Sequence, residues 1–236
     1  MRRVPTFLPV LLLLSGTSGG AGSGPGASDA GVPAEADGGT VIAPSRLAEA
    51  RAMVPAPLLY GQLQPTVGTW VEYDYGTPQG TFRVRAALVG ETVRKDGTRM
   101  FQLELDYATK PRTLVVIWLL GGERPMVDRL AVSVPPNAPI SIPVDLYADE
   151  PQLRGVLTRE KDTEVRGGSF AGKARQRDFR LESGRTASVV TTPKVPLFGV
   201  ESVRGGEATW VARKSGTGAK PELSSVPIAI PRLPGQ

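Results

Sequence analysis

Few residues in this chain have the potential for catalytic chemistry, because its 236 residues include neither histidine nor cysteine. The absence of histidine removes the commonest general base and zinc ligand and excludes a Ser-His-Asp triad. The absence of cysteine excludes disulfides, thiolate catalysis, thiolate metal sites and a lipidated cysteine. The remaining candidate bases are carboxylates and lysines, and no constellation of them selects a catalytic centre. The sequence therefore predicts a non-enzymatic protein with no cofactor and no metal site.

A glycine-rich segment, residues 167–174 (GGSFAGKA), comes close to the phosphate-binding P-loop. Its glycines and Lys173 have the required spacing, but Ala174 stands where a Ser or Thr binds magnesium, and no helix-forming run follows. The segment also misses the nucleophile elbow, since Ala171 replaces the second glycine of that motif. We predict a glycine-rich hairpin turn at this position.

Carboxylates two residues apart are the other candidate for acid–base chemistry. They occur in three alternating segments that are acidic, basic and acidic in turn: Glu72 and Asp74, Arg83 and Arg85, Glu104 and Asp106. On neighbouring antiparallel strands, each opposite-charge pair contributes roughly 0.2–1 kcal/mol. The carboxylates thus have a structural use, and we expect them to face water.

The elements that carry these residues are mostly strands. Apolar and polar residues alternate at period two from residue 69 to residue 214, interrupted by turn residues. A proline-rich stretch at 135–143 predicts a loop or an edge strand. One helix is expected at 45–54, capped by Ser45 and ended by Pro55. The predicted fold is mainly β: a single strongly curved antiparallel sheet or half-barrel with one short N-terminal helix.

The segment at 114–120 (LVVIWLL) breaks the alternation because it is apolar on both faces. Such a strand must be covered on both sides or lie against something apolar and external. Val116, Trp118 and Leu120 are therefore candidate ligand-binding residues on the wall of a hydrophobic cavity. The alternative is that the strand is simply buried core.

A second distinctive segment is the proline- and glycine-flanked corner at 193–200 (PKVPLFGV). This motif resembles the C-terminal hairpins of uncharacterised bacterial envelope proteins, which are similar to the periplasmic lipoprotein-carrier superfamily. The resemblance covers roughly residues 65–215 in strand order. It implies an unclosed antiparallel β-barrel with helices over its open side and an apolar ligand. Leu197 and Phe198 then either plug one end of the core or form the lip of an apolar pocket.

The ends of the chain have the composition of targeting and linker segments. Arg2 and Arg3, an apolar run at 7–14 and small residues to 24 have the order of a secretory signal peptide. We predict a signal peptide at 1–24, a disordered tether at 25–43, a β-rich domain at 44–218 and a proline-rich disordered tail at 219–236. The apolar run is shorter than the about 20 residues that span a bilayer, so no transmembrane segment is expected.

Export without cysteine favours the bacterial periplasm or the cell exterior. Charge is uneven, because residues 25–150 carry 11 basic and 15 acidic side chains whereas residues 151–220 carry 14 and 7. This asymmetry fits either attraction within one sheet or an anionic partner, but no aromatics interleave with the basic residues as nucleic-acid binding would require.

The sequence thus predicts an exported envelope monomer that binds or shields a lipid, an acyl chain or an acylated protein. The alternative is a structural module that docks an envelope protein through its apolar strand.

Overall fold

The protein is described by a computed structural model that covers residues 47–230, except for residues 123 and 207. The predicted signal peptide and tether lie outside the described residues. The helices are α1 (Leu47–Met53), α2 (Ala56–Tyr60) and α3 (Pro151–Arg154). The strands are β1 (Trp70–Thr77), β2 (Gly80–Val93), β3 (Arg99–Tyr107), β4 (Thr113–Leu120), β5 (Met126–Ser133), β6 (Ile140–Tyr147), β7 (Val156–Val165), β8 (Gly172–Arg180), β9 (Thr186–Thr191), β10 (Val200–Arg204), β11 (Thr209–Gly216) and β12 (Ile228–Ala229).

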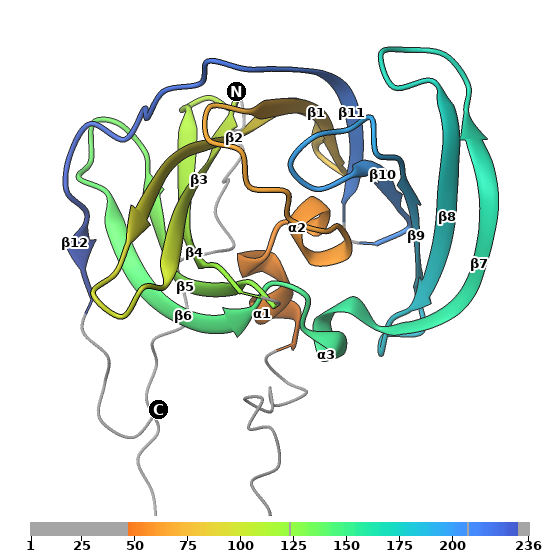
Figure 1. Ribbon diagram of the computed structural model, residues 1–236, viewed down its shortest axis with the longest axis horizontal. Helices are drawn as coiled ribbons and strands as arrows, with labels where there is room; N and C mark the ends of the chain where they lie inside the picture. Colours follow the sequence, from red (N-terminus) through yellow and green to blue (C-terminus); the bar gives the residue numbers. More distant parts are fainter. Residues whose placement is uncertain (1–46, 123, 207, 231–236) are drawn as a thin grey trace, which may run out of the picture.

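These strands form one twelve-stranded sheet in the order β12-β6-β5-β4-β3-β2-β1-β11-β10-β9-β8-β7. Every neighbouring pair is antiparallel except β12 with β6, which is parallel. The sheet is strongly curved but not closed, because β6 and β7 do not pair and α3 alone connects them (Figure 1). The predicted mainly β half-barrel is confirmed, with three short helices instead of one.

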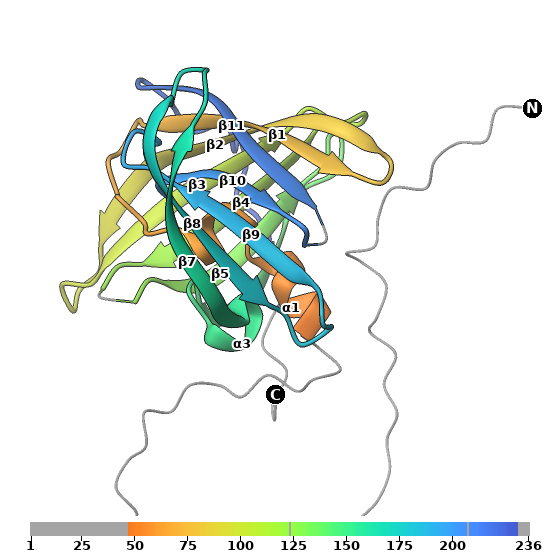
Figure 2. The same cartoon turned by 90° about the vertical axis from the view of Figure 1, so that its right-hand side faces the viewer.

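The concave face of the sheet surrounds the hydrophobic core. Figure 1 shows the strands curving around α2, and Figure 2, turned by 90°, shows α1 and α3 together at one end of the sheet. The core takes alternate residues from most strands, among them Val71, Tyr73, Val84, Leu88, Leu103, Leu105, Ile117, Leu119, Val189 and Val203, each at most 2% exposed. The period-two alternation of the sequence therefore sorts apolar side chains inward and charges outward.

The strand register confirms the predicted alternation of charges on the outer face, except at Glu104. Glu72 lies opposite Arg85, which in turn lies opposite Asp106. Further cations complete the pairing, since Lys214 contacts Glu72 at 3.3 Å and Arg112 contacts Asp106 at 2.7 Å. Glu72 and Asp106 thus act as cross-strand partners on the outer face of the sheet. The expectation that Glu104 faces water is wrong, because Glu104 lies opposite Ala87 and Val116 and is 3% exposed.

The proline-rich stretch at 135–143 is only partly a loop, because β6 begins at Ile140. Pro143 lies opposite Arg129, where the register of β5 and β6 shifts at a bulge. A bulge tolerates the missing N–H of proline, which explains how a strand accommodates this residue.

The C-terminal segment differs from the sequence-based prediction of a disordered tail at 219–236. Residues 217–230, which we call the strap, cross from β11 along the outside of the sheet to β12 (Figure 1). The Ala219 N–H donates to the carbonyl oxygen of Gly68 at 2.9 Å, and the N–H groups of Glu222 and Leu223 donate to the buried carboxylate of Glu104. Satisfied backbone groups and the apolar contact of Leu223 order the segment despite its prolines.

In the described part of the chain, no helix has the length and apolarity needed to cross a membrane.

Candidate functional site

The corner predicted from its sequence motif lies inside the half-barrel. Leu197 and Phe198 are 0% and 1% exposed and belong to the main core. The Phe198 N–H donates to the Pro196 carbonyl at 2.8 Å, and the Thr192 N–H donates to the Gly199 carbonyl at 2.8 Å. These two bonds close a tight turn whose side chains point into the interior.

The turn holds Leu197 in an unusual backbone conformation. Its φ is +67°, a value that a non-glycine residue rarely adopts, and Gly199 follows at +68°. Left-handed backbone costs an L-residue roughly 1–2 kcal/mol. Burial of the Leu197 side chain offsets this cost, so the corner keeps its shape only while it stays packed inside the sheet.

Helix α2 and the residues after it pack directly on the corner. The N–H groups of Gln62 and Gln64 donate to the carbonyls of Phe198 and Leu197, at 3.0 and 2.7 Å. Gly61 makes this approach possible, because a Cβ at this position would lie 2.3 Å from the Phe198 carbonyl oxygen. Together, residues 56–64 and 195–199 form a unit that fills the concave face, and we call it the plug.

Two arginines bind the last carbonyls of α2. Arg154 donates from Nε and Nη2 to the Leu59 carbonyl at 2.9 and 2.7 Å, and Arg177 donates from Nη2 to the Tyr60 carbonyl at 3.1 Å. Burial lowers the pKa of the Arg154 guanidinium. A cation at the C-terminal end of a helix is favourable for the helix dipole. These two arginines, the clamp, tie the plug to α3 and β8.

Apart from the Arg154 and Arg177 guanidinium groups at its edge, the plug packs through apolar side chains near α2. Leu58 and Leu59 are 2% and 1% exposed, and Tyr60 stacks on Phe179 with ring centroids 5.1 Å apart. Elsewhere in the core, Tyr73 and Tyr107 pack near Trp210, and burial raises the pKa of both phenols. The Tyr73 hydroxyl donates to the Val200 carbonyl at 3.3 Å, so this aromatic group has a packing role.

The two groups of predicted ligand-binding residues are not brought together. Val116 and Trp118 lie on the outer face of β4, in a small cluster under Leu223 of the strap, whereas Leu197 and Phe198 lie in the interior. Leu120 lies opposite Met100 and Met126 near the end of the same strand.

The concave side of β4 is formed instead by Ile117 and Leu119, which sequence reasoning missed. Ile117 and Leu119 lie opposite Leu103 and Phe101 of β3, so all four side chains point to the same, concave face. Since β3 alternates clearly and β4 does not, pairing the two in the sequence would have identified the inner residues.

The site offers mainly apolar contact, with the Arg154 and Arg177 guanidinium groups at its edge. The structure describes no cluster of three or more acidic side chains positioned for a metal ion among residues 47–230. The near-P-loop forms the turn between β7 and β8, with Gly167 and Gly168 at φ of +82° and +78°, as the prediction of a hairpin turn requires.

No protein-family model matches the sequence, and neither does any curated protein.

Proposed function

We propose that this protein is an exported, non-enzymatic envelope protein that binds an apolar chain, such as the acyl chain of a lipid or of an acylated protein, on the concave face of its half-barrel. In the ligand-free state the plug occupies this face. Binding displaces the plug toward the gap between β6 and β7.

The observation that carries the proposal is how the half-barrel is filled. A sheet of this length usually buries its apolar face by closing or by packing on a second layer. Here the sheet stays open between β6 and β7, and the five-residue α2 and a corner fill the interior. Apart from Arg177 at the edge of the plug, the strand residues on the concave face include buried apolar side chains such as Ile117 and Val189, which a site for an acyl chain requires.

The backbone of the plug supports a displaceable element. Leu197 adopts a left-handed conformation that relaxes once the corner leaves the interior. The plug is held at its edge by directional hydrogen bonds from Arg154 and Arg177 rather than by continuous strand pairing. Such contacts re-form after a ligand leaves, which favours reversible exchange.

The cellular location in this proposal rests on the N-terminal sequence. The basic, apolar and small residues at 2–24 have the order of a secretory signal, and the absence of cysteine fits an envelope protein that relies on its core for stability.

The alternative function, docking of a partner protein through the outer face of β4, is less well supported because the strap already covers this face. Val116 and Trp118 are 0% and 8% exposed there, under the strap. A partner would first have to remove residues 217–230, so the concave face is the better supported site.

The test measures contact quenching by dibromostearic acid, whose bromine atoms quench tryptophan fluorescence at short range. Trp210 lies in the interior, whereas Trp118 lies on the outer face of the sheet. The full chain is purified without detergent in two forms: Trp70→Phe/Trp118→Phe, which keeps Trp210, and Trp70→Phe/Trp210→Phe, which keeps Trp118. Stearic acid, which does not quench, serves as the control ligand.

We expect saturable quenching of Trp210 and no quenching of Trp118. Quenching confined to Trp118 would place the ligand on the outer face, and no quenching in either form would remove the acyl-chain proposal. Circular dichroism of both variants establishes that they remain folded.

A further inference from the structure

The edge strand β7 has no evident role in the core. It is ten residues long, and eight of these residues, 156–162 and 164, are exposed. Among the described residues, no strand pairs with its outer edge. Its apolar residues Val156 and Leu157 are 71% and 47% exposed. A long free edge presents unpaired N–H and C=O groups and is a template for an additional strand.

The charges of β7 are sorted by face. Register places Glu160 opposite Arg177 and Glu164 opposite Lys173 of β8. Arg177 points to the concave side, since it binds the Tyr60 carbonyl of the plug. Because opposite residues share a face, the acidic residues of β7 point to the concave side.

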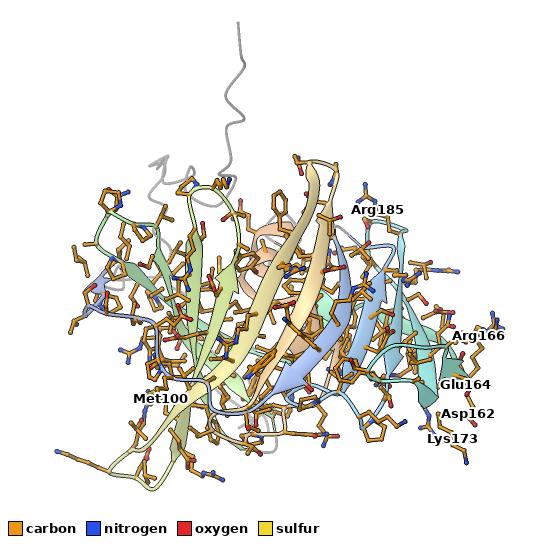
Figure 3. All side chains as sticks on the ribbon, turned by 90° about the horizontal axis from the view of Figure 1, so that it is seen from above. Met100, Asp162, Glu164, Arg166, Lys173 and Arg185 are labelled. Atoms are coloured by element: carbon orange, nitrogen blue, oxygen red, sulfur yellow. The ribbon has the colours of Figure 1, made fainter. Side chains whose placement is uncertain are left out.

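Each face of β7 carries a short row of charged residues of one sign. The concave row of β7 consists of Glu160, Asp162 and Glu164, and the convex row contains Arg159 and Lys161. Figure 3 shows Asp162 and Glu164 at the outer end of the β7–β8 hairpin with Arg166 and Lys173, away from the rest of the sheet. The side chain of Asp162 is 91% exposed, so its contact with Arg175 at 3.6 Å leaves it accessible to another strand.

This pattern excludes a second copy of the chain as the antiparallel partner. Two identical edges that pair antiparallel are related by a twofold axis perpendicular to the sheet, which keeps the concave faces on the same side. The acidic row would then face an acidic row, and the basic row a basic one. Like charges directly opposite each other destabilise a sheet.

We propose that the free edge of β7 binds an extended segment of another protein as an additional strand, with basic side chains on its concave side and acidic side chains on its convex side. Backbone hydrogen bonds supply the affinity, as in other cases of β-augmentation, and the two charged rows set register and partner. This interaction is separate from the acyl-chain site, because β7 contributes no residue to the plug.

The test uses fluorescein-labelled peptides and the full-length chain. The probe is an eight-residue peptide in which Lys and Glu alternate. One control has the same composition in blocks of two, which places both signs on both faces of a strand. A second control carries N-methyl groups on alternate backbone amides along one edge, and a third carries them along the opposite edge. Binding is measured by fluorescence anisotropy.

We expect the alternating peptide to bind, the block peptide to bind at least about tenfold more weakly, and one of the two N-methylated peptides to lose binding. Asp162→Lys should weaken the alternating peptide about tenfold, whereas Glu182→Lys, an equal charge change in the β8–β9 turn, should have little effect.

Failure of the alternating peptide to bind would overturn the proposal. Equal binding by the block peptide, or by both N-methylated peptides, would also overturn it, because either result reports attraction between charges without strand pairing. Equal effects of Asp162→Lys and Glu182→Lys on peptide binding would overturn it too, because they would show that only the net charge matters.

Discussion

Replacement of Arg154 by Met tests how the plug is held. The Arg154 guanidinium donates two hydrogen bonds, at 2.9 and 2.7 Å, to the carbonyl of Leu59. Methionine keeps the apolar part of the side chain and removes both donors. The Leu59 carbonyl then loses this pair of bonds at the end of α2, where intrahelical partners are missing.

The expected loss follows from the type of bond. A hydrogen bond to a charged group contributes about 1.5–3 kcal/mol, and the two bonds here share one acceptor and one cation, so we expect Arg154→Met to lower the free energy of unfolding by about 2–3 kcal/mol. For a chain of this size, this corresponds to roughly 4–12 °C in the midpoint of thermal unfolding. Arg154→Lys, which retains one donor group, should lose about half as much.

The assay is urea unfolding of the full chain, followed by tryptophan fluorescence. Arg83→Met is the matched control, because Arg83 is an exposed arginine whose contact with Glu72 is 4.0 Å long. Its loss should stay below about 1 kcal/mol. If Arg154→Met and Arg83→Met shift the urea midpoint equally, the clamp does not hold α2 and the reasoning is refuted.

Three further predictions address other contacts. Gly61→Ala should destabilise the chain by more than about 3 kcal/mol, because the new Cβ would lie 2.3 Å from the backbone of the corner. Gly97→Ala is the control and should cost only about 1 kcal/mol, because Gly97 has open space around it and a φ of +84°. Thermal unfolding compares the two variants. Burial raises the pKa of the Tyr73 phenol, so on raising the pH the unfolded chain loses this proton before the folded chain does. The free energy of unfolding therefore falls as the pH rises above about 10. In Tyr73→Phe, the urea midpoint should fall less between about pH 8 and about pH 11. Truncation after Gly216 removes the strap and should shift tryptophan emission to longer wavelength, because Trp118 becomes exposed; an unchanged spectrum would contradict the covering role of the strap.

The fold could be predicted because its alternation is local. The strands around Val84 and Leu103 carry apolar residues mostly at period two, and Arg85 of one strand matches Asp106 of the other in register. Elements that cross the outside of the sheet, such as the strap, were harder to predict from the sequence, because their order depends on partners that are distant in the chain. The strap is ordered by the carboxylate of Glu104, far away in the sequence, and composition alone suggested disorder.

The candidate site could be predicted only in part, for a related reason. The corner at 193–200 has a local signal, a proline before and a glycine after two large apolar residues, and the structure places both in the core. Residues 114–120 are apolar on both faces, so period two could not tell Val116 from Ile117. Only pairing with β3 decides which face points inward.

The central claim, that an acyl chain takes the place of the plug, is tested most directly by hydrogen exchange with and without stearic acid. The informative amides are those of Gln62 and Gln64, which are bonded to the corner, with Leu103 in β3 as the reference. We predict that stearic acid speeds exchange at Gln62 and Gln64 and leaves Leu103 unchanged. Unchanged or slower exchange at Gln62 and Gln64 while stearic acid is bound would contradict the displacement of the plug.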